Sequence, residues 1–126
     1  MIALGSDHGG FLLKEEVKKY LDEKGVAYTD FGVNSEQAAD YPDIAELVGS
    51  RVAAGEFNLA VLFCGTGVGI SIAANKIKGV RAACCSDYFS AKYTRLHNNA
   101  NILCLGGRVI GAGLACELVD VFINTT

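Results

Sequence analysis

Several features that would mark a specialised protein are scarce or absent in this sequence. The 126 residues include one proline and no tryptophan, and 20% are charged while 51% are hydrophobic, which excludes a disordered chain. Lysine and arginine number 11 against 14 acidic residues, and this net charge of −3 disfavours nucleic acid as a partner, because phosphate backbones require a basic face. The length predicts one domain over residues 1–126, large enough to fold without metal or disulfide support.

Long hydrophobic runs are also missing. The longest apolar run, residues 59–64, falls far short of the roughly 18 residues that suggest a membrane span. Residues 1–8 have no basic region and too short an apolar stretch for a signal peptide. We expect a cytoplasmic protein that has no membrane partner.

The five cysteines follow no metal-binding or disulfide pattern. Their number is odd and no two are spaced C-x-x-C, so neither a zinc site nor a disulfide framework is supported. We expect Cys84, Cys85, Cys104 and Cys116 to be small buried hydrophobic residues. Cys64 needs separate treatment because of the turn that follows it.

Short apolar runs alternate along the chain with segments of helical period, as is typical of βαβ units. Strands are expected over residues 2–5, 27–31, 59–64, 80–84 and 102–105, and helices over 10–24, 42–55, 70–76, 88–96 and 112–123. Pro42 suits the first position of the second helix, and residues 59–64 suit a central strand buried on both faces. The sequence therefore predicts an α/β fold: a Rossmann-like three-layer α/β/α sandwich around a five-stranded parallel sheet.

Residue types capable of chemistry concentrate where the predicted strands end. Because the carboxyl ends of parallel strands meet at one edge, where ligands bind in open α/β sheets, we expect this edge to carry the function. The residues collected there are Ser6, Asp7, His8, Gly32, Cys64, Gly65, Thr66, Ser86, Asp87, Gly106, Gly107 and Arg108. This asymmetry favours an enzyme over a scaffold.

Alternating glycines, Gly65, Gly67 and Gly69, follow the third predicted strand and lead into a helix. They let the backbone curl closely round a bound group, and amides at a helix start favour an anion or oxyanion. The pattern matches neither the dinucleotide fingerprint nor a P-loop, which disfavours nucleotide binding. A cysteine phosphatase is also disfavoured, because Ile70 stands where such an enzyme needs an arginine for the phosphoryl group.

Cys64 stands immediately before this turn and is the strongest candidate for catalysis. The start of the following helix favours the thiolate, a usable base or nucleophile, and the alternative is a buried strand-end residue. His8 and His97 both lie in polar segments, where a single histidine is more often a cap or surface residue than a catalyst. Asp7 is a candidate catalytic carboxylate or simply the N-cap of the first helix.

Five segments, in order along the whole chain, are similar to one enzyme family. They are residues 5–14 (GSDHGGFxLK), 40–42 (DYP), 64–76 (CGTGVGISIAANK), 97–98 (HN) and 107–108 (GR). The chain resembles type B ribose-5-phosphate isomerase, in the ribose/galactose/allose phosphate isomerase family. The resemblance implies the strand order 2-1-3-5-4 and the interconversion of ribose 5-phosphate and ribulose 5-phosphate through a cis-enediolate. No metal or organic cofactor is implied.

The same resemblance implies a role for each matching residue. Cys64 would carry a proton between two carbons, while the Thr66 hydroxyl and the glycine-turn amides would stabilise the substrate oxyanion. Asp7 and His97 match positions that open the furanose ring and handle hydroxyl protons. The implied substrate-binding residues are His8 and Arg108 near the phosphate, Gly65, Gly67, Val68 and Gly69 in the turn, and Asn98 and Tyr41 at the sugar.

Two further expectations concern the phosphate and the assembly. Relatives continue past the last helix into an arginine-bearing tail that contributes to phosphate binding, whereas this sequence ends at Thr126, so Arg108, His8 and Arg95 hold the phosphate or a tail is absent from it. Helix 88–96 leads roughly 13 Å away from the functional edge, which separates His97 from Cys64. We therefore expect a homodimer whose two sites are shared across a two-fold interface, or a dimer of such dimers.

Two alternative functions remain open on the sequence alone. One is an isomerase for a hexose 6-phosphate of the allose or galactose type. The other is a non-catalytic protein that binds sugar phosphates at the same site without converting them.

Overall fold

The computed structural model describes residues 1–32 and 41–126. Residues 33–40, which include Asp40 of the DYP segment, lie outside the described residues. The strands are β1 (Ile2–Ser6), β2 (Tyr28–Asp30), β3 (Ala60–Cys64), β4 (Ala82–Cys84) and β5 (Ile102–Gly106). The helices are α1 (Phe11–Glu23), α2 (Tyr41–Ala53), α3 (Val68–Asn75), α4 (Tyr88–Leu96) and α5 (Ala112–Asn124). A short 3-10 turn, η1 (His8–Gly10), precedes α1.

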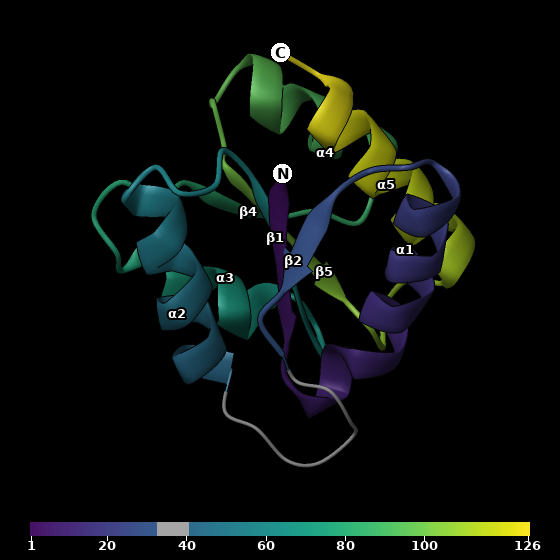
Figure 1. Ribbon diagram of the computed structural model, residues 1–126, viewed down its shortest axis with the longest axis horizontal. Helices are drawn as coiled ribbons and strands as arrows, with labels where there is room; N and C mark the ends of the chain where they lie inside the picture. Colours follow the sequence, from purple (N-terminus) through teal and green to yellow (C-terminus); the bar gives the residue numbers. More distant parts are fainter. Residues whose placement is uncertain (33–40) are drawn as a thin grey trace.

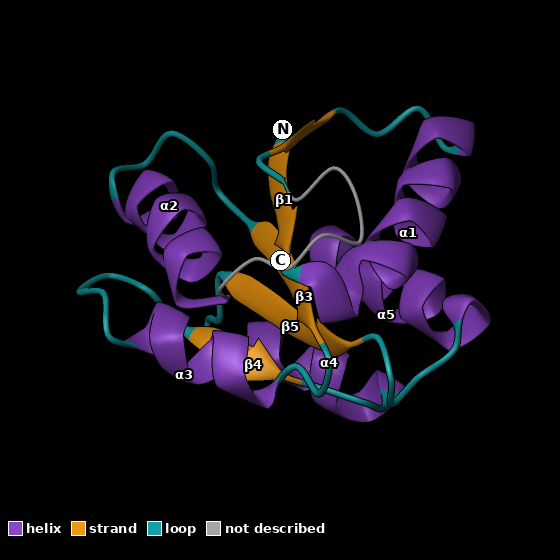
Figure 2. Cartoon of the chain, turned by 90° about the horizontal axis from the view of Figure 1, so that it is seen from below, coloured by secondary structure: helices purple, strands orange, loops and turns teal. Residues whose placement is uncertain are grey.

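The strands form one parallel sheet in the order β2-β1-β3-β5-β4, which confirms the order implied by the resemblance. Figure 1 shows α2 and α3 on one side of this sheet and α1 and α5 on the other, and Figure 2 shows the same layers from below. Every residue of β3 and β5 is buried, as expected for strands covered on both faces. The three-layer α/β/α sandwich is confirmed. Among the described residues, no helix is both long and apolar enough to cross a membrane.

The observed element boundaries differ from the expected ones by a few residues. The clearest difference lies at the start of the first helix, where Asp7 caps η1 before α1 begins. Gly10 lies so close to β3 that a Cβ on it would overlap the backbone of Phe63. Packing of the turn against β3 thus requires a residue without a side chain at Gly10, the second residue of the Gly9-Gly10 pair. Helix α2 begins at Tyr41, one residue before Pro42.

The expectation of buried cysteines is wrong at one position. Cys85 and Cys104 are buried and Cys116 is half-buried, but Cys84 is exposed. Cys84 ends β4, a three-residue strand at the edge of the sheet, so only one neighbouring strand covers it. The sequence pattern of a short apolar run does not distinguish an edge strand from a central one.

A buried ion pair joins α1 to the end of β2. The Lys14 side chain is fully buried, and its Nζ lies 2.8 Å from both carboxylate oxygens of Asp30. Asp30 also accepts hydrogen bonds from Lys18 Nζ at 3.0 Å and from the Gly32 amide at 2.9 Å. The Gly32 carbonyl in turn accepts the Ser6 amide at 2.7 Å. The pair therefore supports the chain that leads from β1 into the carboxyl edge of the sheet.

Replacement of Asp30 tests this support. Asp30→Asn replaces the carboxylate that lies 2.8 Å from the buried Lys14 ammonium with a neutral amide, so we expect the free energy of unfolding at pH 7 to fall by about 3 kcal/mol in urea denaturation. Glu16→Gln is the matched control, because Glu16 pairs with Lys19 on the surface and should contribute less than about 1 kcal/mol.

The Asp30 contribution should also depend on pH. Burial raises the pKa of Asp30, but the hydrogen bonds from Lys14, Gly32 and Lys18 outweigh burial and hold the pKa below its ordinary value of 3.8. The unfolded chain therefore binds the proton at a higher pH than the folded chain, and the stabilisation is lost as the pH falls below about 4. The stability difference between wild type and Asp30→Asn should shrink there, and a constant difference between pH 7 and pH 3 contradicts the assignment.

Candidate active site

The turns that follow β1, β3 and β5 meet at the carboxyl edge of the sheet. A Cβ on Gly9 would lie 3.1 Å from the Gly65 nitrogen, and one on Gly107 would lie 2.6 Å from the Gly9 carbonyl oxygen. The Gly107 amide donates to the Cys64 carbonyl at 2.8 Å, and the Arg108 amide donates to the Gly65 carbonyl at 3.0 Å. Three segments far apart in the sequence thus form one surface, as the strand-end argument predicted.

Cys64 lies at the end of β3 with its side chain held by the glycine turn. The residue is 4% exposed, and its Sγ accepts a hydrogen bond from the Gly67 amide at 3.1 Å. Gly67 adopts a φ of +81°, and Thr66 Oγ1 accepts the Val68 amide at 3.2 Å. The amides of Gly67 and Val68 therefore donate hydrogen bonds to Cys64 Sγ and Thr66 Oγ1 within the turn. The amides of Gly65 and Gly69 are donors in neither of these bonds.

The other four thiols differ from Cys64 in their surroundings. Burial raises the pKa of Cys85 to about 11 and raises the pKa of Cys104 well above its usual range. Partial desolvation also raises the pKa of the half-buried Cys116 and, although its residue is exposed, of Cys84. These four thiols are therefore mostly protonated near neutral pH.

Asp7 and His8 lie next to the Cys64 turn on the segment that leaves β1. The Asp7 side chain is buried, and its Oδ1 accepts the Gly10 amide at 3.1 Å. The structure therefore confirms that Asp7 is an N-cap, since it caps η1. The same hydrogen bond holds its carboxylate beside Gly9 and Gly65. His8 is exposed at the start of η1, where its imidazole can meet a ligand from solvent.

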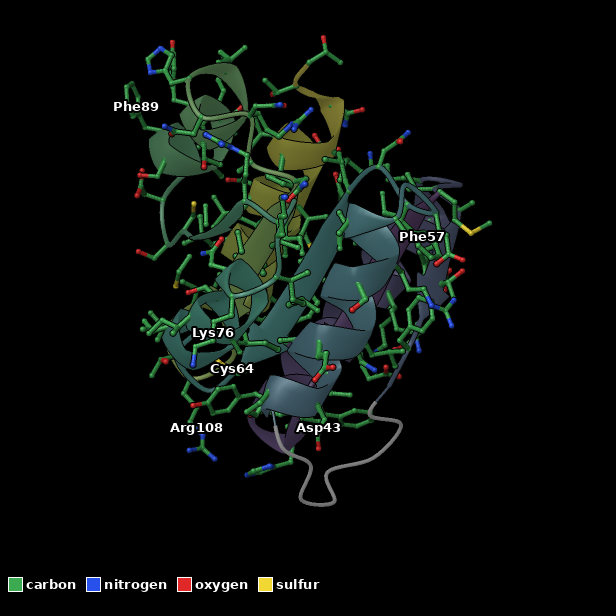
Figure 3. All side chains as sticks on the ribbon, turned by 90° about the vertical axis from the view of Figure 1, so that its left-hand side faces the viewer. Asp43, Phe57, Cys64, Lys76, Phe89 and Arg108 are labelled. Atoms are coloured by element: carbon green, nitrogen blue, oxygen red, sulfur yellow. The ribbon has the colours of Figure 1, made fainter. Side chains whose placement is uncertain are left out.

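Arg108 and Tyr41 approach the glycine turn from two other elements. The Arg108 Cδ and Nη1 atoms lie 3.8 and 3.9 Å from the position of a Cβ on Gly65, and Figure 3 shows Cys64 and Arg108 at the same end of the molecule. The Tyr41 ring packs on Gly69, where its Cζ would lie 2.9 Å from a Cβ. Tyr41 and Gly69 also line a cavity of about 410 Å³ between α2 and α3.

His97 and Asn98 lie in a different part of the molecule from the Cys64 turn. His97 caps the end of α4, and its ring lies 4.8 Å from that of Tyr93. Both residues line a hollow of about 330 Å³, together with Cys85, Phe89, Ser90, Tyr93 and Thr94. Figure 3 shows Phe89, on the same helix, at the opposite end of the molecule from Cys64. A single chain thus brings together Asp7, His8, the Cys64 turn and Arg108, and places His97 and Asn98 elsewhere.

The sequence argument did not assign a role to Gly9, Gly10 and Gly107, which let the turns approach each other. The available signal is the pair of adjacent glycines after two strands, Gly9-Gly10 and Gly106-Gly107, since such pairs mark close backbone contact. The residues that the structure describes contain no group of three or more His, Cys, Asp or Glu side chains arranged to hold a metal ion.

The fold is an open parallel α/β sheet, a class of protein whose ligands bind at the carboxyl edge of the strands. Residues 2–126 match the Ribose/Galactose Isomerase family model. The chain is 49% identical to ribose-5-phosphate isomerase B of Escherichia coli over 98% of this chain and 83% of the relative. The chain belongs to the ribose/galactose isomerase family, and it is a sugar-phosphate isomerase.

Solved structures agree with this membership. A ribose 5-phosphate isomerase from Thermotoga maritima is 51% identical with a TM-score of 0.96, over 98% of this chain and 86% of that one. A ribose-5-phosphate isomerase B from Mycoplasma genitalium with bound ribulose-5-phosphate is 40% identical with a TM-score of 0.93, over 99% and 84%. Other relatives, 43% and 41% identical, are named as isomerases of erythrulose 4-phosphate and galactose 6-phosphate. Membership therefore establishes the reaction class, and the individual sugar is a separate question.

Gly67→Ala tests whether the turn geometry is essential. A Cβ there would lie 2.9 Å from the Leu105 carbonyl carbon and 3.0 Å from Cys84 Sγ, at a positive φ that alanine adopts poorly. We expect stability to fall by more than about 1 kcal/mol and isomerase activity by about 100-fold. Gly113→Ala in α5 is the control, since no atom lies within 4 Å and activity should be unchanged. An active Gly67→Ala enzyme contradicts the role of the turn.

Proposed function

We propose that the protein interconverts ribose 5-phosphate and ribulose 5-phosphate, with Cys64 as the base. The observation that carries this proposal is the Cys64 Sγ atom at the carboxyl edge, 3.1 Å from the Gly67 amide and beside the turns that bear Asp7 and Arg108. The names of the E. coli and T. maritima relatives support the five-carbon sugar.

The proton transfer proceeds in balanced steps. The Cys64 thiolate removes the proton from C2 of the open-chain aldose, the electron pair forms the C1–C2 double bond, and negative charge collects on O1. A proton then passes from the C2 hydroxyl to O1, so the charge moves to O2. Finally the Cys64 thiol returns its proton to C1 as the C2 carbonyl forms, which yields the ketose and restores the thiolate.

The oxyanion of this intermediate needs donors, because a proton next to a carbonyl is only weakly acidic. The Gly65 amide and the Thr66 hydroxyl lie on the turn that follows Cys64, and the Gly69 amide lies in the first turn of α3. Donors fixed in this way stabilise charge as it develops without reorganisation. We assign Gly67 and Val68 to shaping the turn, since their amides donate to Cys64 Sγ and Thr66 Oγ1.

Ring opening and phosphate binding fall to the residues around this centre. Asp7 and His97 transfer the hydroxyl protons, and Tyr41 and Asn98 contact the sugar. His8 and Arg108 face the phosphate from two sides of the turn, and a guanidinium binds phosphate through paired hydrogen bonds. The position of Arg108 against Gly65 supports this assignment.

We propose that the working unit is a homodimer in which His97 and Asn98 reach the partner's Cys64 turn. Two observations support this. His97 and Asn98 lie in a hollow that contains no residue of their own Cys64 turn. Large apolar side chains also remain exposed on α3 and α4, including Ile72 at 56% and Phe89 at 66%, together with Val68 and Tyr88. Exposed apolar surface of this kind is typical of a protein interface.

Hydrogen exchange tests the role of Cys64. In heavy water the wild type should convert ribose 5-phosphate to ribulose 5-phosphate and exchange the C2 proton, as measured by NMR. Cys64→Ala should lose conversion and exchange by about 1000-fold or more, because no other thiol can replace the base. Cys116→Ala is the matched control on the distant α1–α5 surface and should remain active.

The outcomes of this experiment separate the alternatives. Full activity of Cys64→Ala contradicts the assigned base. Faster turnover of allose or galactose 6-phosphate than of ribose 5-phosphate contradicts the proposed sugar while leaving the reaction class intact. Heat on ligand titration without any exchange in the wild type indicates a binding protein.

Mixing two inactive variants tests the shared site. Homodimers of Cys64→Ala and of His97→Ala should each be nearly inactive. A hybrid of the two contains one site with both an intact Cys64 and an intact His97, so random reassortment should restore about a quarter of wild-type activity. Mixing without subunit exchange is the control. A monomer with full activity, or hybrids that stay inactive, contradicts the shared site.

A further inference from the structure

The segment that carries His97 and Asn98 is built as a rigid turn. Helix α4 ends with a hydrogen bond from the Ala100 amide to the Thr94 carbonyl at 2.9 Å and one from the Asn99 amide to the Arg95 carbonyl at 3.2 Å. Asn99 adopts a φ of +50°, the one positive value outside glycine in the described part of the chain. The Asn99 bond, which runs from the left-handed residue to the carbonyl four residues earlier, is the αL C-cap motif, in which asparagine is accepted.

The His97 ring is fixed from the helix side as well. Phe89, Tyr93 and His97 follow each other at four-residue spacing on one face of α4. The rings of Phe89 and Tyr93 stack at 4.4 Å, and the His97 ring lies 4.8 Å from Tyr93 at an interplanar angle of 56°. The imidazole direction therefore depends on the helix and on the turn that follows it.

One long-range contact supports this turn from the edge of the sheet. Arg81 Nε donates to the Asn98 carbonyl at 2.7 Å. The Arg81 backbone is itself fixed, because its amide donates to Asn101 Oδ1 at 2.8 Å and its carbonyl accepts the Asn101 amide at 2.9 Å. A guanidinium at the end of α4 also faces the negative end of the helix dipole.

The sheet edge next to Arg81 is held in turn by α3. Asn75, at the end of α3, forms two hydrogen bonds of 2.8 Å with the amide and the carbonyl of Ala82. The side-chain amide thus pairs with β4 where the next strand of a sheet would lie. A continuous set of bonds therefore connects α3, β4 and the Asn98 turn through Arg81.

We propose that Arg81 is a positioning residue for the isomerase reaction: it orients the His97–Asn98 turn toward the site that this turn serves. The inference rests on the proposed roles of His97 and Asn98. Catalytic groups tolerate little displacement, since misplacement by about 1 Å can cost about 100-fold in rate. Arg81 itself touches no substrate in this scheme. Its loss should therefore affect turnover more than binding.

The test compares steady-state kinetics of Arg81→Ala with those of the wild type. We expect kcat to fall by about 10- to 100-fold while KM changes less than about threefold, and guanidinium ion added at millimolar concentration to restore part of kcat. Arg81→Lys keeps the charge but lacks the Nε donor, so it should also lose kcat, and it serves if Arg81→Ala does not fold. Arg51→Ala, which removes an arginine whose Nε lies 3.4 Å from Glu56 on the surface, is the control and should match the wild type with or without guanidinium.

His97→Ala, measured in parallel, separates the two hypotheses. If His97→Ala loses activity while Arg81→Ala and Arg81→Lys keep wild-type kcat, Arg81 has no positioning role. The inference about Arg81 is then overturned, while the proposed role of His97 stands. If His97→Ala is fully active, the proposed role of His97 is wrong and the inference falls with it. A loss of kcat in Arg81→Ala that guanidinium does not reverse, accompanied by an equal loss of thermal stability, indicates a purely structural role and also overturns it.

Discussion

The site depends on the close approach of three backbone turns at one edge of the sheet. Gly10 lies on Phe63, Gly107 on Gly9, and Gly106 on Thr66, where a Cβ would come within 2.6 Å of the Thr66 carbonyl oxygen. No side chain fits between these segments, so they share a single surface. This contact is what places Asp7, Cys64 and Arg108 around one point although they are far apart in the sequence.

The surroundings of that point distinguish one thiol from the others. Cys64 Sγ accepts an amide hydrogen bond within the glycine turn, while burial raises the pKa of Cys85, Cys104 and Cys116. The ion pair of Lys14 and Asp30 stabilises the adjoining ends of β1 and β2 through Gly32. Contacts distant from the site thus contribute to its geometry, because the turns keep their positions only if the strands that lead into them stay aligned.

Helix α4 accounts for the separation of His97 and Asn98 from the Cys64 turn. It starts beyond the carboxyl edge at β4 and carries His97 and Asn98 to a separate hollow, while α3 and α4 keep exposed apolar side chains. The proposed homodimer would bring the His97–Asn98 hollow of one copy to the Cys64 turn of the other. Arg81, at the edge of the sheet, supports the turn that contains Asn98.

The sequence by itself determined the alternation of strands and helices, the strand-end location of the functional residues and the special position of Cys64, because periodicity and turn composition are local properties. The resemblance of its segments to a known family added the strand order, which the structure confirms. Only the tertiary structure decided that Cys84 is exposed, that Lys14 is fully buried, that Gly10 must lack a side chain and that Arg81 reaches Asn98. Each of these depends on contacts between residues distant in the chain, which a local pattern does not encode.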